Sequence, residues 1–350
     1  MSDPDPSALA APLVTWFDGH QRELPWRGVR DAYRVWVSEV MLQQTQVETV
    51  KRYYEPFLAR FPDVAALAAA SEGEVLAAWQ GLGFYRRARN LHRGAQQVVR
   101  EHGGELPRDP AALGRLPGLG RYTVGAVLSL TFDQRLPILD GNVARVLARV
   151  FRVEGSLKQG PVARRLWALA EEVLPERRVG AFNEALMELG ALVCRPTSPA
   201  CARCPLAAHC GARAEGRPTA YPEPVPAAEV PQVERVCLAV VRGDGRFCLV
   251  QRPAEGLLAR MWELPAREFA GDEDPATVAR ELAREHGARG RPTALGTAEH
   301  RFSHRHWVQH VYRVETRATR AAGTWVGADE LAGYGVPTAA RKALRLAGLG

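Results

Sequence analysis

Two acidic residues lie in sequence surroundings that are unusual for a carboxylate. Glu39 belongs to SEVMLQQTQV and falls on the mainly apolar face of a segment with helical periodicity. Asp140 belongs to LPILDGNVARVL and lies between an apolar run and a second helix, where it could equally be the helix N-cap. Because burial raises the pKa of an unpaired carboxyl, such a residue can act as a general acid. Most single acids are solvated or cap a helix, so this assignment depends on the motifs around them.

Four cysteines form a second candidate site. They follow the spacing C-x6-C-x2-C-x5-C, and they are Cys194, Cys201, Cys204 and Cys210. The spacing is typical of a metal site, and both zinc and a [4Fe–4S] cluster suit four thiolates in one compact loop. A loop of this length cannot bury a core of its own, so the metal would fold it. Arg195 and Arg203 within the loop could present positive charge to a phosphate backbone.

A third motif, LPGLGRYTVGAVLSL (116–130), combines a glycine-containing turn with the start of a helix near Tyr122. Gly118 and Gly120 would let backbone N–H groups approach a ligand closely, and the helix dipole would add positive charge. The motif is therefore typical of a hairpin that grips phosphate between two helices. An ordinary connector between two helices is the alternative at this point.

The segments that must position these residues begin with a long helical part. Residues 8 to about 215 have helical periodicity almost throughout, with a capping box at Ser71 and Glu74. The stretch 214–231 then contains five prolines and few large apolar residues, which predicts an extended linker. The length of 350 residues also favours two domains.

The residues after the linker predict a smaller α/β domain. Two β-rich runs in 234–252 are joined by RGDG, which is a hairpin signal. A helix at about 275–287 and a strand-rich stretch at 298–314 follow. Cys237 and Cys248 occupy strand positions of the hairpin, where we expect buried core cysteines.

The composition indicates an ordinary globular protein with a modest basic surplus. Lys and Arg number 46 against 39 acidic residues, which gives a net charge of +7 and makes a polyanionic partner plausible. No apolar run approaches the roughly 18 residues of a membrane span. The N-terminus lacks the basic region of a secretory signal. We therefore expect a cytoplasmic protein, associated with the bacterial nucleoid, in which disulfides are disfavoured.

The motifs occur in one order that resembles the adenine DNA glycosylases of the MutY type, in the helix–hairpin–helix superfamily. The stretches that carry the resemblance are SEVMLQQTQV, GLGFYRRARNLH (81–92), LPGLGRYTVGAVL, LDGNVARVLAR (139–149) and FNEALMELGALVC (182–194). The resemblance implies a mainly α glycosylase domain with an iron–sulfur cluster loop, linked to a smaller α+β Nudix-like domain. The implied boundaries are 8–213 for the glycosylase domain (six-helix part about 31–136, cluster-bearing part about 8–30 and 137–213), 214–232 for the linker and 233–350 for the Nudix-like domain.

The resemblance also implies a cofactor, a substrate and a chemistry. The four cysteines would hold a [4Fe–4S] cluster, and the substrate would be adenine mispaired with 8-oxoguanine or guanine in duplex DNA, bound by a monomer. Glu39 matches the general acid, and Asp140 matches the electrostatic or nucleophilic carboxylate. Cleavage of an N-glycosidic bond needs such a pair, because the leaving base must be protonated and the oxocarbenium-like sugar stabilised. Tyr122 and Asn142 would support the sugar and the attacking water.

Further residues match positions that handle the flipped base, since a base inside a duplex must leave the stack to react. The residues that match positions filling or wedging the vacated stack are Gln43, Gln44 and Tyr85; helix surface and core packing are their alternatives. The residues that match the lining of the adenine pocket are Trp26, Arg27 and Glu184. Trp26 could instead be plain core.

Two other functions are alternatives to a monofunctional adenine glycosylase. Endonuclease III shares the hairpin, the aspartate and the cluster, but its signature lysine is replaced here by Tyr122, and a phenol cannot form a Schiff base. We therefore predict a monofunctional glycosylase rather than a bifunctional one. Family members often carry a lysine after DGNV, where this chain has Ala144, which puts only a side reaction in doubt. A non-catalytic iron–sulfur protein that binds DNA is the second alternative.

The C-terminal part resembles the Nudix-like domain of these glycosylases through GLLARMWELPA (256–266). In the candidate Nudix box RELAREHGA (280–288), Arg284 replaces a required acid, so we expect no Mg²⁺-dependent hydrolysis. The loop that matches 8-oxoguanine recognition is Phe302, Ser303 and His304, where the serine could bond the N7–H of the oxidised base. One parity is shared by His300, His304, His306 and His310, so a regular strand would place them on one face, as a zinc site or facing DNA.

Overall fold

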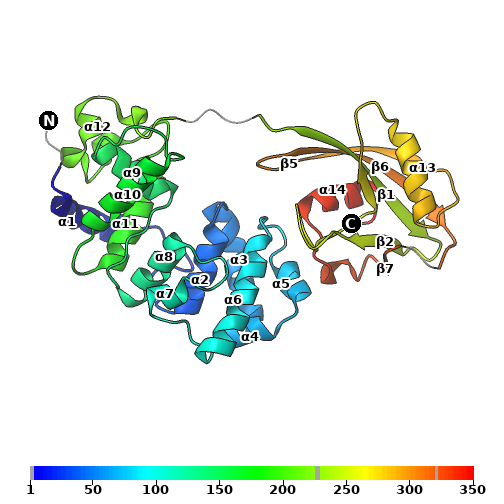
Figure 1. Ribbon diagram of the computed structural model, residues 1–350, viewed down its shortest axis with the longest axis horizontal. Helices are drawn as coiled ribbons and strands as arrows, with labels where there is room; N and C mark the ends of the chain where they lie inside the picture. Colours follow the sequence, from blue (N-terminus) through cyan, green and yellow to red (C-terminus); the bar gives the residue numbers. More distant parts are fainter. Residues whose placement is uncertain (1–3, 225–228, 320–321) are drawn as a thin grey trace. The chain divides into compact units, whose positions relative to one another are not determined.

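The computed structural model describes residues 4–224, 229–319 and 322–350 (Figure 1). Its contacts divide the chain into two compact units. The first comprises the described residues of Met1–Ala69 and Asn90–Ala227, and the second comprises those of Ala70–Arg89 and Ala228–Gly350. The segment 70–89, which the sequence analysis places in the helical domain, is thus grouped with the second unit. Residues 225–228 of the expected linker lie outside the described residues.

The first unit is helical, as the periodicity of the sequence indicates. Its α-helices are α1 (Ala10–His20), α2 (Ala32–Leu42), α3 (Val47–Arg60), α4 (Val64–Ala69), α6 (Arg86–His102), which starts in the second unit, α7 (Pro110–Leu113), α8 (Arg121–Phe132), α9 (Gly141–Val150), α10 (Gly160–Glu172), α11 (Val179–Leu192) and α12 (Gly211–Ala214). Short 3₁₀ turns η1 to η4 cover Pro6–Leu9, Cys201–Arg203, Ala207–His209 and Pro218–Ala220. Among the described residues, no helix is both long and apolar enough to span a membrane.

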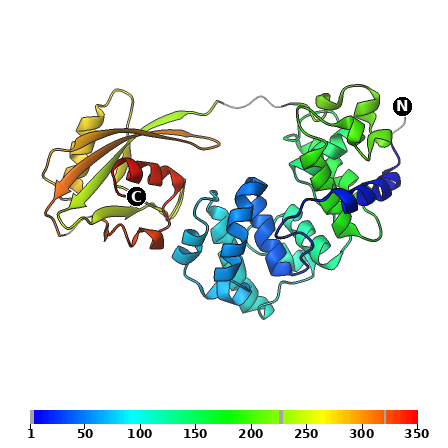
Figure 2. The ribbon, with the colours of Figure 1, turned by 180° about the vertical axis from the view of Figure 1, so that it is seen from behind.

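Helix α8 is the centre of this unit. It packs against α2 and α11, and α11 packs in turn against α1 and α9 (Figure 2). Most side chains of α8 are buried. Gly125 and Gly180 permit the close approaches: a Cβ at Gly125 would lie 2.3 Å from the Pro137 carbonyl oxygen, and one at Gly180 would lie 2.6 Å from the Ser129 oxygen. The C-terminal part of α2, the starts of α8 and α9 and one face of α11 therefore surround one cavity.

The second unit contains a mixed sheet of seven strands with a helix on each face. The strand order is β3-β2-β1-β6-β5, with β4 on β1 and β7 on β2, and within the described residues β1 and β6 are the only parallel pair. The strands are β1 (Gln232–Arg242), β2 (Phe247–Gln251), β3 (Trp262–Glu263), β4 (Ala266–Glu268), β5 (Thr293–Arg301), β6 (His306–Thr316) and β7 (Thr324–Val326). The helices and the 3₁₀ turn of the unit are α5 (Glu72–Ala78), α13 (Pro275–Glu285), α14 (Thr338–Leu346) and η5 (Leu331–Gly333). The expected α+β domain is therefore present.

Alternation along β1 separates two cores. Val236, Leu238 and Val240 pack with α13, whereas Cys237 and Ala239 pack on the face that α14 covers. Both cysteines of the hairpin are buried, at 3% exposure for Cys237 and 0% for Cys248, which confirms the expected core cysteines. The capping box of Ser71 and Glu74 at the start of α5 is confirmed as well.

The expectation of one histidine face on a regular strand is wrong. The chain reverses at 302–305, so His300 lies on β5 and His306 on β6, while His304 is in the turn. His300 is paired with Trp307, and cross-strand partners point to the same face. Since His306 and Trp307 are adjacent on β6, their side chains point to opposite faces. His300 is therefore on the opposite face from His306 and His310.

Candidate active site

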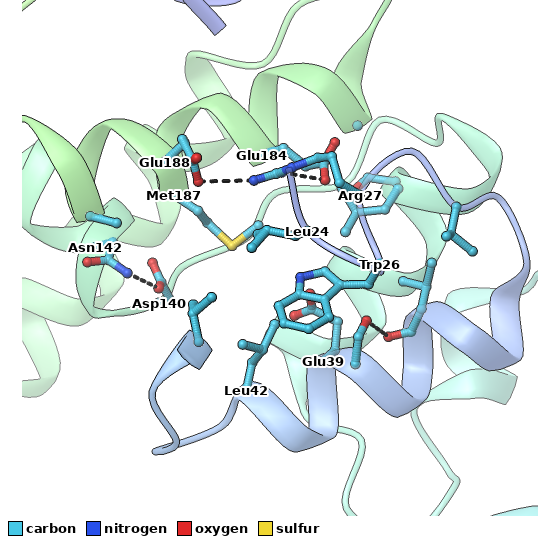
Figure 3. A pocket seen from close by; sticks show the side chains of 18 of the residues that line it. Leu24, Trp26, Arg27, Glu39, Leu42, Asp140, Asn142, Glu184, Met187 and Glu188 are labelled. Atoms are coloured by element: carbon cyan, nitrogen blue, oxygen red, sulfur yellow. Dashed lines mark hydrogen bonds and ion pairs between the residues drawn. The ribbon is translucent and has the colours of Figure 1, made fainter. Parts of the chain in front are cut away.

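A cavity of about 770 Å³ opens among the helices of the first unit, and Figure 3 shows part of its lining. Its walls come from α2 and the turn after it, the start of α8 and of α9, the inner face of α11, and the segment before α2. The lining residues named in the sequence analysis are Trp26, Arg27, Glu39, Gln43, Gln44, Tyr122, Asp140, Asn142 and Glu184. The structure thus brings together residues from five separate segments of the chain.

Glu39 lies on α2 and is 4% exposed. Its pKa is raised to about 7, mainly by burial and in part by the negative charges of Asp140 and Glu184. The Tyr122 hydroxyl donates a hydrogen bond to Glu39 Oε2 over 2.7 Å and lowers that pKa, as does the charge of Arg27. The carboxyl is thus close to half protonated at neutral pH, which suits a general acid.

Asp140 caps a helix and also lines the cavity. Its Oδ1 accepts a hydrogen bond from Val143 N over 2.7 Å, which makes it the N-cap of α9. Its Oδ2 accepts one from Asn142 Nδ2 over 2.9 Å, and the residue also lines the cavity. Burial raises the pKa of Asp140, whereas these hydrogen bonds lower it. The cap fixes the direction of the carboxylate and so holds a second acid at the cavity that contains Glu39.

The wall from the segment before α2 is both structural and cavity-forming. Trp26 is 8% exposed and packs edge-on against Tyr54, with ring centroids 5.5 Å apart, yet it also lines the cavity. Arg27 Nη1 donates to Glu184 Oε1 over 2.6 Å. Burial raises the pKa of Glu184, and the contact with Arg27 opposes that shift. The core and pocket alternatives for Trp26 are therefore compatible.

The sequence did not point to two charged residues of this wall, Arg22 and Glu188. Glu188 is 2% exposed and accepts hydrogen bonds from both Arg22 and Arg27. Figure 3 shows Glu184 and Glu188 side by side on the same helix, with Arg27 against both. The signal that could have found Glu188 is its spacing of four residues from Glu184, which places both on one helix face.

The expected stack-filling residues differ in exposure. Gln44 is exposed and has a φ of +56°, while Gln43 is half-buried and donates from Nε2 to Thr123 Oγ1 over 3.2 Å. Tyr85 is only 4% exposed, which agrees with its core-packing alternative, and its assignment to the vacated stack stays a prediction. The neighbouring Phe84 is 47% exposed and has a φ of +47°. The two adjacent aromatics in GFYRR indicate that one ring points outward and the other inward. The sequence alone does not indicate which of Phe84 and Tyr85 is the exposed one.

The glycine turn before α8 has the geometry that a tight hairpin requires. Gly118 has a φ of +81°, and a Cβ there would lie 2.8 Å from the Cβ of Asn90. Gly120 is the N-cap of α8, and a Cβ there would meet nothing within 4 Å. The helix therefore starts at Arg121, one residue from the expected position, with an open approach to its N-terminus.

The four clustered cysteines form no disulfide among the described residues and are half-buried. Cys194, Cys204 and Cys210 pack against the core of the first unit. The pKa of the Cys204 thiol is raised to about 11, mainly by burial and in part by the other three thiols. Within the described ranges, no three His, Cys, Asp or Glu side chains are arranged to hold a metal ion. The donor set, four thiols without a disulfide, fits a [4Fe–4S] cluster by its chemistry.

Two arginines of α9, one buried and one half-buried, support this loop. Arg149 is 2% exposed and donates from Nη1 to Cys194 Sγ over 3.3 Å and to the Arg195 carbonyl oxygen over 2.8 Å. Arg145 Nε donates to the Cys194 carbonyl oxygen over 2.7 Å. Arg195 and Arg203 themselves are exposed. The loop is therefore anchored at its first cysteine and presents two cations to solvent.

The second unit holds the candidate Nudix box and the FSH loop. Arg267 forms ion pairs with Glu281 and Glu285, the acids of the box, so these carboxylates are occupied by a cation of the chain itself. Ser303 and His304 are exposed in the turn between β5 and β6. The Phe302 ring packs against Trp307 at 5.0 Å between centroids. The ion pairs of Glu281 and Glu285 with Arg267 disfavour a Mg²⁺ site. The side chain of Ser303 is accessible to solvent.

Comparisons with known proteins agree with this architecture. Residues 37–172 match the model described as "HhH-GPD superfamily base excision DNA repair protein", and residues 236–346 match a NUDIX domain. The chain is 36% identical to the adenine DNA glycosylase of Rattus norvegicus, over 98% of this chain and 78% of that protein. It is 35% identical to the Homo sapiens enzyme of that name, over 97% and 74%.

Solved structures also resemble the first unit. A thermostable thymine-DNA glycosylase is similar with a TM-score of 0.55 and 28% identity, and the match covers 60% of this chain and 97% of that one. A trapped endonuclease III–DNA covalent intermediate shares the fold, with a TM-score of 0.51 and 22% identity over 60% and 96% of the two chains. The helical unit thus has the fold of base-excision glycosylases.

Proposed function

The chain belongs to the adenine DNA glycosylase family and is a DNA glycosylase, and we propose that it excises adenine mispaired with 8-oxoguanine or guanine in duplex DNA. We propose further that it acts as a monomer, by hydrolysis alone, and leaves an abasic site. The observation that carries the proposal is the placement of Glu39, Tyr122 and Asp140 on one cavity. A base must leave the duplex to enter such a cavity.

The two carboxyl groups would divide the chemistry. Glu39, with its pKa near 7, would donate a proton to the leaving adenine. Asp140, held by the α9 amide of Val143 and by Asn142, would stabilise the positive charge that develops on the sugar. Asn142 would also help to place the attacking water. Arg27 and Glu184 form a polar wall whose donors and acceptors could orient the base.

Hydrolysis without strand cleavage is supported by what the cavity contains. A Schiff base with the sugar requires an amine nucleophile. None of the residues that line this cavity in the described part of the chain is a lysine, and Tyr122 is engaged with Glu39. The cavity thus offers acids and a phenol but no amine.

Contacts to the duplex would come from both units. Gln43, Gln44 and Phe84 are the residues we propose for the vacated stack, and the turn of Gly118 and Gly120 would receive a phosphate. The exposed Arg195 and Arg203 would add phosphate contacts. The turn residues Phe302, Ser303 and His304 would read the base opposite the adenine.

The cysteine loop would hold the cofactor. We propose a [4Fe–4S] cluster on Cys194, Cys201, Cys204 and Cys210, which would fold the loop. In that loop it would keep Arg195 and Arg203 in place beside the DNA, which is a structural contribution. The catalytic proposal itself depends on Glu39 and Asp140.

The deciding experiment uses a labelled duplex with one A:8-oxoguanine pair, incubated with the cluster-loaded protein and divided before analysis. One half is heated in alkali, which breaks the strand at an abasic site, and the other is not. We expect cleavage only after alkali, and no cleavage with the Glu39→Gln protein. Cleavage without alkali would contradict the monofunctional mechanism, and intact strands in both halves would contradict the glycosylase. Parallel duplexes with A:G and A:T pairs measure the dependence on the opposite base.

A further inference from the structure

One buried carboxylate of the cavity wall has more partners than any role above requires. Glu188 Oε1 accepts from the backbone N of Arg22 over 2.9 Å and from its Nε over 2.8 Å. Oε2 accepts from Arg22 Nη2 over 2.8 Å and from Arg27 Nη2 over 3.0 Å. Four donors therefore converge on a side chain that is 2% exposed. Hydrogen bonds to charged groups in such surroundings fix geometry strongly.

Arg27 is shared between two acids of α11. Its Nη1 faces Glu184 at 2.6 Å and its Nη2 faces Glu188 at 3.0 Å, while the guanidinium lies 5.0 Å from the Phe17 ring centroid. A guanidinium is planar, so two contacts at its two ends set its plane as well as its position. With Glu188 removed, the plane would be free to turn about the remaining contact with Glu184.

We propose that Glu188 is a positioning residue, which clamps Arg27 against Glu184 and so orients the polar wall that receives the excised base. The proposal rests on the proposed function of this cavity. Glu188 would touch neither the base nor the sugar, and would act through Arg27. Arg22 would serve the same clamp from the other side, because three of the four bonds to Glu188 come from it.

The charges of the clamp are consistent with this assignment. Burial alone would raise the pKa of Glu188, but the bonds from Arg22 lower it overall, so the residue stays ionised. Glu184 has the opposite shift, because burial raises its pKa and the charge of Glu188 contributes. Arg27 thus lies between two carboxylates whose pKa values are shifted in opposite directions. Glu188 is the more firmly anchored of the two, because it accepts three further hydrogen bonds from Arg22.

A double-mutant cycle separates this role from a general contribution to stability. Single-turnover excision from the A:8-oxoguanine duplex is measured for the wild type, Glu188→Gln, Arg27→Gln and the double variant, all loaded with their cofactor. We expect each single variant to lose about 10- to 100-fold in rate, because a misplaced wall misorients the base. If Glu188 acts through Arg27, the double variant should be no slower than the slower single variant, within about threefold. Rates that multiply, or a Glu188→Gln protein as fast as the wild type, would overturn the proposal.

Two controls keep the outcome unambiguous. Glu172→Gln removes a carboxylate from an exposed ion pair of the same unit, with Arg165, that does not line the cavity, and it should change the rate less than about twofold. Should Glu188→Gln fail to fold, by its circular dichroism and Tm, the cycle is run with Glu188→Asp, which retains the charge, and the same comparison decides. A wild type that excises no adenine would refute the proposed function itself, whereas an active wild type with additive variants refutes only the clamp.

Discussion

The Tyr122 hydroxyl lies 2.7 Å from Glu39 Oε2 and donates a hydrogen bond to that oxygen inside the cavity. This contact works against burial, because a hydrogen bond to a carboxylate favours the ionised form whereas desolvation favours the protonated one. Burial is the larger effect, and the pKa remains near 7. With Oε2 engaged by the phenol, the proton to be transferred would reside on Oε1. The contact with Tyr122 therefore affects both the pKa of Glu39 and the choice of the carboxyl oxygen that would carry the proton.

Replacement of Tyr122 by Phe should move the pH profile of excision in a defined direction. The phenol lowers the pKa of Glu39, so its loss should raise that pKa. A general acid is active while protonated, and its activity falls as the pH rises through its pKa. The falling limb of the single-turnover rate should thus move to higher pH in Tyr122→Phe, whatever happens to the maximum rate. A limb that moves to lower pH would show that the hydroxyl acts differently.

Removal of the Glu39 charge should increase stability at high pH while it abolishes turnover. The folded-state pKa of Glu39 is raised from 4.5 to about 7, so the folded protein binds the extra proton between these values. Stability from this group is fully present below the unfolded pKa and is lost as the pH rises through the folded one. Glu39→Gln should therefore exceed the wild type in free energy of unfolding by on the order of 1–3 kcal/mol at pH values above about 7.

The measurement is urea unfolding of both proteins at a pH below the window and at one above it. The difference between the two proteins should grow with pH, and duplex binding by Glu39→Gln should remain close to that of the wild type. A constant difference across the window would mean that Glu39 titrates normally.

The cluster proposal predicts different outcomes for two kinds of cysteine. Cys204→Ser should lose iron and the visible absorbance of an iron–sulfur protein, because a ligand of the loop is removed. Cys237→Ala, which changes a buried core cysteine of the second unit, should retain the full iron content. Iron per chain and the absorption spectrum measure both. Zinc in place of iron in the wild type, found by elemental analysis, would contradict the proposed cofactor.

The sequence predicted elements better than it predicted exposure. Helical periodicity and the change of composition at the linker were sufficient for the two-part architecture, whereas the joint placement of Glu39, Tyr122 and Asp140 was implied only by the family resemblance. The adjacent aromatics of GFYRR could not be separated in this way, because the turn at Phe84 has a positive φ that no periodicity encodes. Tyr85 is consequently inside and Phe84 outside.

Tertiary pairing explains the other differences. The four histidines are all at even-numbered positions, but a turn at 302–305 reverses the chain. Alternation predicts the face of a side chain only within one strand, so it does not relate residues of β5 to those of β6. Glu188 was missed for a related reason: its importance comes from Arg22 and Arg27, more than 160 residues away along the chain. Contacts of that range are set by packing, and a single sequence contains no record of them.

Exchange of Phe84 and Tyr85 for Ala should separate DNA contact from core packing. Phe84→Ala should weaken binding to the mispaired duplex by about 1–3 kcal/mol, the value of one stacked base, with little change in Tm. Tyr85→Ala should instead lower the free energy of unfolding by about 2–5 kcal/mol, because it empties a buried site. Duplex affinity and thermal unfolding are measured for both. The reverse pattern would restore Tyr85 as the stacking residue.

Ser303 provides the test of opposite-base reading. Its hydroxyl is exposed in the turn between β5 and β6 and could accept the N7–H that 8-oxoguanine carries and guanine lacks. Ser303→Ala should therefore slow excision opposite 8-oxoguanine by about 5- to 10-fold, the value of roughly one hydrogen bond, and leave excision opposite guanine unchanged. Thr293→Ala, an exposed hydroxyl on β5 of the same sheet, is the matched control and should alter neither rate. Equal losses on both duplexes would assign Ser303 to general DNA binding, and no loss on either would remove it from the recognition loop.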